Sequence, residues 1–149
     1  MSEALFYHLE RRALEDVLPG LVERTLERGW RALIRAESAE RAEAIDNLLW
    51  TYDDSSFLPH AQAGDGDSAR QKVLISVEAG NPNAADVLFL VGGAETDWNE
   101  RFTRVVTMFD GRDETMLAKA RAAWKAAKSS GLDVTYWKEM PGGKFEKQA

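Results

Sequence analysis

The chain has 149 residues, a formal net charge of −6 and no cysteine. Its length suits one domain with its own core, and the lack of cysteine excludes disulfides, thiolate zinc sites and cysteine nucleophiles. No apolar run approaches the roughly 18 residues that a membrane-spanning helix needs, so we expect no membrane segment. The first residues lack the basic stretch and long apolar run of a secretory signal, so we expect a cytoplasmic protein.

Strand-like and helix-like segments alternate along the chain. Short apolar runs indicate buried strands, and apolar residues at helical spacing indicate amphipathic helices. In chain order the pattern predicts a strand over 4–9, a helix over 14–28, a strand over 30–35, a helix capped by Ser38 and ending near Trp50, strands over 73–77, 87–91 and 102–109, a helix over 113–130 and a strand over 134–138. The crossover connections favour a mostly parallel sheet with helices on both faces, a Rossmann-like three-layer α/β fold.

The chain shows no internal repeat and no low-complexity linker, so we expect a single domain over residues 1–149. The polar residues 140–149 are predicted to form a loosely ordered tail. Residues 53–71 form the one long irregular stretch, and the polar, glycine-containing second half of that stretch is typical of a mobile loop.

A nucleotide site at the first strand–helix turn is the usual feature of this fold, but its motif is missing. A GxGxxG motif needs glycines so that backbone amides can approach phosphate, and residues 9–13 contain none. No GxxxxGK[ST] phosphate loop is found in the chain. The alternative that stays open is a small nucleotide-binding enzyme that uses the turn at Gly92 and Gly93.

Candidate catalytic and metal-binding residues are few. His8 and His60 are far apart in the sequence, and no spacing pattern pairs either with a second ligand. Asp65 and Asp67 flank a glycine but lack the spaced acids and terminal glutamate of a calcium loop. The serines have no nucleophile-elbow context. We therefore expect no catalytic residue, no metal and no cofactor.

The charge is unevenly distributed along the chain. Residues 119–149 contain seven Lys/Arg and three Asp/Glu and carry +4, whereas residues 1–118 carry −10. An acidic body repels nucleic acid and anionic membranes, while a local basic face attracts an acidic peptide. We therefore expect an anionic protein partner, no strong direct DNA binding and no membrane binding. Direct nucleic-acid binding by the basic C-terminal strip is a third interpretation, but the sequence reveals no regular aromatic stacking platform.

One face of the helix over 113–130 combines an indole with cations. Leu117, Arg121, Trp124, Lys125 and Lys128 follow at i, i+4, i+7, i+8 and i+11, and this spacing places them on one side of a helix. Such a face fits a chain terminus, because the indole receives the last side chain and a cation receives the terminal carboxylate. Arginine can bind both carboxylate oxygens. The alternative is a core tryptophan beside solvated lysines.

A second candidate surface follows the helix that ends near Trp50. The segment after it presents Phe57, Leu58 and Pro59. Loops this apolar either pack onto the body of the domain or form a docking patch, and both interpretations stay open on these grounds.

The chain resembles the family of chi subunits of bacterial DNA polymerase III. The chi subunits are accessory proteins of the clamp loader. The resemblance extends to about Trp137 and rests on the segments FYHL, GWRALIRAES, IDNLLW, SFLPH and FTRVVTMFDG. It implies a nucleotide-binding type of fold without the phosphate-binding turn. It also implies a non-catalytic adaptor that joins the clamp loader, through the psi subunit, to the acidic C-terminal tail of single-stranded DNA-binding protein. The resemblance implies that this tail contains aspartates and ends in a phenylalanine with a free carboxylate.

The resemblance also assigns residues to two binding sites. It implies that the tail of single-stranded DNA-binding protein binds at Phe109, Arg121, Trp124, Lys125 and Lys128. Leu117 departs from the family pattern because a basic residue is expected there, and Trp124 stands where tyrosine is common. Trp50, Phe57 and Pro59 are implied to contact psi or an alternative helicase partner, so we expect a monomer alone and a heterodimer in complex.

Overall fold

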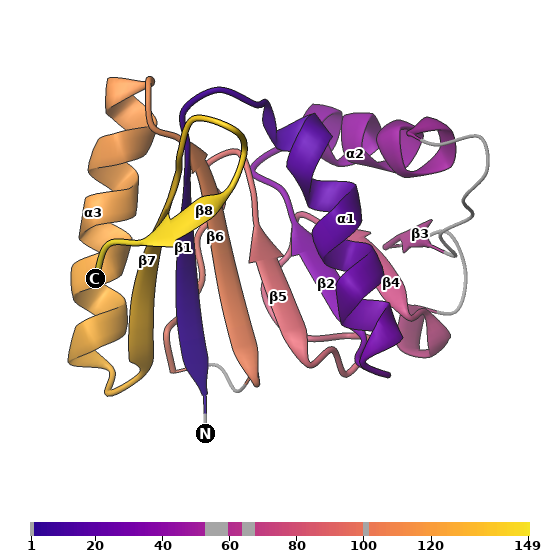
Figure 1. The fold of residues 1–149 in the computed structure, drawn as a ribbon. Coiled ribbons are helices and arrows are strands. Elements are labelled where there is room, and N and C mark those ends of the chain that lie inside the picture. The colour runs from indigo at the N-terminus through magenta and orange to yellow at the C-terminus, as the bar shows by residue number, and fades with distance from the viewer. Residues whose placement is uncertain (1, 53–59, 64–67, 100–101) are drawn as a thin grey trace.

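The computed structural model describes residues 2–52, 60–63, 68–99 and 102–149 (Figure 1). In chain order its elements are β1 (Glu3–Leu9), α1 (Leu14–Glu27), β2 (Ala32–Arg35), α2 (Ala39–Thr51), β3 (Ala61–Gln62), a 3₁₀ turn (Ser68–Arg70), β4 (Val73–Ser76), β5 (Val87–Leu90), β6 (Arg104–Asp110), α3 (Glu114–Ser129), β7 (Asp133–Glu139) and β8 (Phe145–Lys147).

The strands of the described residues form one sheet in the order β3-β4-β2-β5-β6-β1-β7-β8. Neighbouring strands are parallel except β7 and β8, which run antiparallel. Because parallel neighbours need crossover connections, α1, α2 and α3 lie against the faces of the sheet. The predicted three-layer, mostly parallel α/β fold is confirmed.

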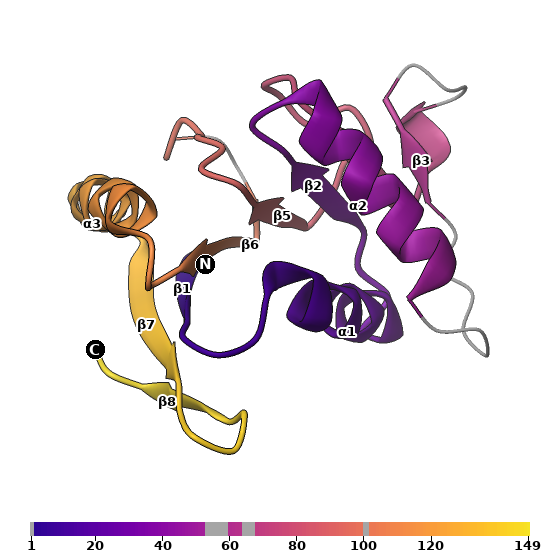
Figure 2. The ribbon, with the colours of Figure 1, turned by 90° about the horizontal axis from the view of Figure 1, so that it is seen from above.

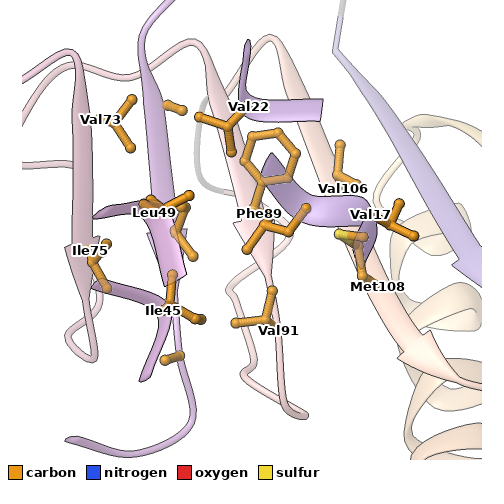
Figure 3. Packing of buried hydrophobic residues seen from close by; sticks show 14 of the residues in the cluster. Val17, Val22, Ile45, Leu49, Val73, Ile75, Phe89, Val91, Val106 and Met108 are labelled. Carbon is orange, nitrogen blue, oxygen red and sulfur yellow. The ribbon is translucent and has the colours of Figure 1, made fainter. Parts of the chain in front are cut away.

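The helices are divided between the two faces of the sheet (Figure 2). α1 and α2 share one core with β2, β4, β5 and β6, and α3 packs over β1, β6 and β7 on the opposite face. Figure 3 shows Ile45 and Leu49 of α2 and Val22 of α1 in the first core, with Phe89 of β5 among them. Every residue of β2, β4 and β5 is buried, as expected for central parallel strands covered on both faces.

A buried arginine ties together the loops at the carboxyl ends of the central strands. Arg35, the last residue of β2, is only 3% exposed. Its guanidinium donates hydrogen bonds to the carbonyl oxygens of Gly80 at 2.9 Å, Glu78 at 3.1 Å and Glu95 at 3.2 Å. A buried cation is tolerated when its donors are satisfied in this way.

Helix ends follow the local signals in the sequence. The side-chain oxygen of Ser38 accepts a hydrogen bond from the backbone N–H of Arg41 at 3.2 Å, which confirms the predicted cap of α2. Gly29 has φ +80° just after α1, in the left-handed conformation that glycine adopts at helix ends without strain.

Two short edge strands, β3 and β8, were not predicted. β8 lies within the residues expected to form a loose tail, and it pairs with β7 after a turn at Gly142 and Gly143. The ring of Phe145 packs edge-on against Tyr7 at 4.9 Å between centroids. A single apolar residue in a polar stretch anchors this strand, so hydrophobic periodicity does not reveal it.

Replacing Ser38 tests whether its side chain stabilises the start of α2. We expect Ser38→Ala to lower the free energy of unfolding by about 1 kcal/mol, because the N–H of Arg41 loses its acceptor. Urea denaturation followed by circular dichroism measures the change. Ser129→Ala, at an exposed position in the last turn of α3, is the control and should change stability by less than about 0.5 kcal/mol. Equal losses in both variants would contradict the role of the cap.

Candidate functional site

The carboxyl ends of the parallel strands meet at one edge of the sheet, where folds of this type usually bind ligands. A cavity of about 260 Å³ lies there, beside the ends of β1 and β6 and the starts of α1 and α3. Cations in its lining are paired with acids, because Arg112 Nε lies 2.9 Å from Asp110 and Arg41 Nε lies 3.3 Å from Glu37. The crevice therefore has little unbalanced positive charge for a phosphate.

The turn after β5 is the position left open for a nucleotide. Gly92 and Gly93 have φ +66° and +89°, a conformation that glycine adopts without strain and that is common where backbone approaches a ligand closely. However, the carboxylate of Glu37 packs against Gly92 so closely that a Cβ atom there would overlap it. A negative charge at this distance repels phosphate, and the geometry therefore gives no support to a nucleotide site at this turn.

The turn between β1 and α1 already binds an anion, and that anion is part of the chain. Glu139, the last residue of β7, is 2% exposed. Its Oε1 accepts hydrogen bonds from the backbone N–H groups of Glu10, Arg11 and Arg12 at 3.0, 2.8 and 3.1 Å. Its Oε2 accepts from Nε of Arg12 at 2.6 Å. Successive N–H groups before a helix are a typical phosphate site, and here a carboxylate fills it.

These hydrogen bonds change the acidity of Glu139. Desolvation by burial acts to raise its pKa, but the Arg12 guanidinium and the N–H groups of the turn outweigh burial and lower the pKa from 4.5 to about 2. The carboxylate is therefore ionised throughout the neutral range and stabilises the turn as an anion.

The predicted cationic face of α3 is present in the structure. Arg121, Lys125 and Lys128 are exposed, while Ala120 and Ala127 of the same helix are buried. Within the described residues, none of the three cations forms an ion pair, so all three are available to an anionic partner. Leu117, the apolar member of the predicted set, is partly buried against the core beneath α3.

Trp124 is intermediate between the two predicted alternatives, being neither fully buried nor free in solvent. Its ring meets Phe6 of β1 at 5.6 Å and Tyr136 of β7 at 5.7 Å, both edge-on. The ammonium of Lys128 lies 5.0 Å from the Trp124 ring centre, a cation–π distance. The indole therefore forms a half-buried wall between the helix and the sheet.

Phe109 lies beneath this wall and is 6% exposed. Its ring lies 5.2 Å from His8 and 6.0 Å from Tyr136 between centroids. The structure thus brings Phe109 and Trp124 to the same aromatic cluster through Tyr136. Phe109 therefore supports the Tyr136 ring from inside the core and offers little surface for direct contact with a ligand.

Tyr136 belongs to this aromatic cluster and His8 contacts it from below the helix, and sequence reasoning missed both residues. Nδ1 of His8 lies 2.5 Å from the Tyr136 hydroxyl, and Nε2 of His8 lies 2.8 Å from a carboxylate oxygen of Glu10. Burial raises the pKa of Tyr136, while the positive charge of Arg121 acts to lower it, which links Arg121 electrostatically to the cluster. Strand alternation predicts which face each residue occupies, but only the strand order makes them neighbours.

This arrangement can bind an apolar side chain that carries a carboxylate. The rings of Trp124 and Tyr136 offer partly exposed apolar area, and Arg121 projects from the same helix. Lys125 and Lys128 extend the positive charge along α3, so a peptide that is acidic before its terminus is attracted over one to two helical turns. We refer to Phe109, Arg121, Trp124, Lys125, Lys128 and Tyr136 as the α3 site.

The second predicted surface is described only in part, because Phe57 and Pro59 lie outside the described residues. Trp50, near the end of α2, is 53% exposed. Its ring centre lies 4.5 Å from that of His60, and His60 is buried with Nε2 3.1 Å from a carboxylate oxygen of Asp46. His60 thus supports an exposed indole on the surface of α2.

Other chemistry is not favoured by the described part of the chain. There, no three histidine, aspartate or glutamate side chains gather as metal ligands would, and Asp65 and Asp67 lie outside it. Among the described residues, no helix is both long enough and apolar enough to cross a membrane.

Comparisons with known proteins point to one family. The sequence model of the family described as "DNA polymerase III chi subunit, HolC" matches residues 1–135. The DNA polymerase III subunit chi of Escherichia coli is 28% identical over 148 residues, which cover 93% of this chain and all of that protein. The corresponding subunit of Haemophilus influenzae is 26% identical and covers 89% of this chain and 94% of its own length.

Two further similarities are more limited. A probable DNA polymerase III subunit chi from Rickettsia prowazekii is 28% identical over 91 residues, which are 61% of this chain and 55% of that protein. The C-terminal domain of the DEAD-box protein Dbp5 superposes with a TM-score of 0.59 over 92% of this chain and 90% of that domain. At 14% identity the second similarity shows a shared fold alone.

The buried carboxylate predicts a dependence of stability on acid pH. Because the pKa of Glu139 falls from 4.5 to about 2 on folding, its stabilising contribution is fully present above about pH 4.5. That contribution is lost as the pH falls toward 2. Glu139→Gln should lower the free energy of unfolding by about 2–3 kcal/mol at pH 7. It should also flatten the pH dependence between 4.5 and 2, as measured by urea denaturation at several pH values.

A matched control is Glu146→Gln in β8, since this glutamate is exposed. It should leave both the stability at pH 7 and the acid slope near those of the parent chain. A Glu139→Gln variant with an unchanged acid slope would show that the turn does not depend on the charge.

Proposed function

Because the chain belongs to the family of DNA polymerase III chi subunits, we propose that it works in DNA replication in the cytoplasm as a non-catalytic adaptor. In this proposal it joins the clamp loader, through psi, to the acidic C-terminal tail of single-stranded DNA-binding protein. The observation that supports tail binding most directly is the α3 site, where exposed cations without ion pairs lie beside a half-buried aromatic wall.

The residues of the α3 site have distinct roles in this proposal. Arg121 binds the terminal carboxylate with its planar fork of donors. Trp124 and Tyr136 receive the terminal phenylalanine, because aromatic pairs prefer the edge-on packing that these rings already show. Lys125 and Lys128 attract the aspartates that precede the terminus, and Phe109 supports the rings from below.

A contact of this size is weak and reversible. A micromolar dissociation constant corresponds to about 8 kcal/mol, and exposed charges make such binding sensitive to salt. Many tails displayed on one protein-coated strand raise the effective concentration. The polymerase assembly then stays near the coated strand, while each single contact still dissociates rapidly.

A separate surface serves the other partner. We propose that Trp50 contacts psi or an alternative helicase partner, because an indole that is 53% exposed and supported by a buried histidine is a suitable interface anchor. Phe57 and Pro59 stay predictions for the same interface. The chain alone is then a monomer, and its complex is a heterodimer.

The carboxylate clamp can be tested with a peptide ending Asp-Ile-Pro-Phe. We expect calorimetric titration to give a micromolar dissociation constant that rises with salt. Arg121→Ala should weaken binding at least tenfold, and amidation of the peptide terminus should do the same because it removes the charge that Arg121 binds. Arg11→Ala, which removes an exposed arginine outside the α3 site, is the control. Unchanged affinity in Arg121→Ala would exclude Arg121 as the clamp.

The separation of the two surfaces is tested with Trp50→Ala. We expect this variant to lose most of its co-purification with co-expressed psi or the helicase partner, since it removes the exposed anchor. Its affinity for the tail peptide should stay within about twofold of the parent chain. Loss of both activities in a variant with normal thermal unfolding would show that the surfaces are not separate.

A further inference from the structure

The sheet face opposite α3 is only partly covered at β1 and β7, where Tyr7 lies at the margin of the core beneath α1. α1 and α2 pack mainly over β2, β4, β5 and β6, and β7 and β8 curve toward the side of α1 (Figure 2). Tyr7 and Trp137 are direct partners in the β1–β7 pairing, so their side chains lie on the same face. Both are partly exposed, and they form an aromatic floor beside α1.

A hollow of about 520 Å³ opens over this floor, between α1 and the β7–β8 hairpin. Its lining includes the partly buried Phe145 and the exposed cations Arg24 and Lys144. A second hollow of about 180 Å³ shares Tyr7 and Arg24 with the first and extends the space to Trp30. We call the two hollows together the α1 groove.

The lining of the α1 groove is strongly cationic, although the chain as a whole carries −6. Against these cations the lining has a single acid, Asp16. Within the described residues, Arg24, Arg28 and Lys144 form no ion pair, whereas Arg12 and Arg104 are paired. Such a local excess of positive charge in an acidic protein favours an anionic ligand. The cations of the lining are Arg12, Arg24, Arg28, Arg104 and Lys144.

Cations lie against aromatic rings in the lining of the groove. The guanidinium groups of Arg28 and Arg104 lie 5.2 and 5.3 Å from the Trp30 ring centre, and that of Arg12 lies 5.5 Å from the Phe145 ring centre. Nε1 of Trp137 donates a hydrogen bond to Thr135 Oγ1 at 2.9 Å. Within the described residues no other aromatic ring stacks on the Trp137 indole. Aromatic surfaces interleaved with arginine and lysine are typical of grooves that bind single-stranded nucleic acid.

We propose that the α1 groove binds single-stranded nucleic acid weakly, with bases against Trp137 and the neighbouring rings and phosphates against Arg24, Arg28 and Lys144. An acidic peptide is the less suitable ligand, because extended peptides usually pair with a free strand edge. β1 is paired with β6 and β7, and β7 with β1 and β8, so the floor has no free edge. The proposal does not depend on tail binding, since α3 lies on the other face of the sheet.

The test is fluorescence anisotropy of a fluorescein-labelled oligo(dT) with the full chain. We expect a dissociation constant of about 10–100 µM at low salt, rising steeply as salt is added. Arg24→Glu combined with Lys144→Glu should weaken binding about tenfold, and Trp137→Leu several-fold through lost stacking. Lys119→Glu, which changes an exposed lysine of α3 on the other face, should weaken it less than twofold.

Several results would overturn the proposal. One is the absence of saturable binding of oligo(dT), and another is an equal loss of oligo(dT) affinity in Arg24→Glu and Lys119→Glu. A third is a competition in which an acidic peptide of the same charge binds the groove more strongly than oligo(dT) does. The charge variants change exposed side chains, so they keep the test decisive if Trp137→Leu does not fold. Titration of the Arg24→Glu/Lys144→Glu variant with the tail peptide separates this proposal from the adaptor role, because that affinity should be retained.

Discussion

The carboxylate of Glu139 holds the C-terminal hairpin against the turn between β1 and α1. Three backbone N–H groups and the Arg12 guanidinium converge on it, and Arg12 continues to the carbonyl oxygen of Gly143 at 2.5 Å. This interaction fixes the end of β7. Successive side chains of β7 point to opposite faces of the sheet. Tyr136 points toward α3 and contributes to the α3 site, while Trp137 points toward α1 and forms the floor of the α1 groove. Both surfaces therefore depend on the same ionic contact.

The same contact explains why a fold of the nucleotide-binding type has no nucleotide motif. The N–H groups that commonly receive a phosphate at this turn are occupied by a side chain of the protein, and the arginines of the adjacent crevice are paired with acids. Glycines are unnecessary in the turn because no external ligand must approach its backbone. The surfaces for which we propose binding lie instead on a helix face and over β1 and β7, where several exposed cations form no ion pair within the described residues.

The uneven charge distribution confines the attraction of anionic partners to particular surfaces of the protein. The acidic body repels anions generally. In our proposals, the cations of α3 and those of the α1 groove attract anionic partners locally. For the tail contact that we propose, the rings of Trp124 and Tyr136 add selectivity for an apolar side chain. An acidic segment without such a side chain gains only the salt-screened attraction between charges. The adaptor role that we propose requires an exchange of partners during replication, and contacts that are individually weak but present in many copies allow such exchange.

Most of the fold and the helical half of the α3 site could be predicted from the sequence, because both depend on local spacing. Continuous apolar runs mark β2, β4 and β5, Ser38 marks the start of α2, and the i, i+3, i+7 spacing places Arg121, Trp124 and Lys128 on one face of α3. The neighbours across the sheet could not be predicted. His8 meets Tyr136, Tyr7 meets Trp137, and Glu139 reaches the β1–α1 turn only because β7 pairs beside β1. Strand order results from packing between segments far apart in the chain, and hydrophobic periodicity contains no information about it.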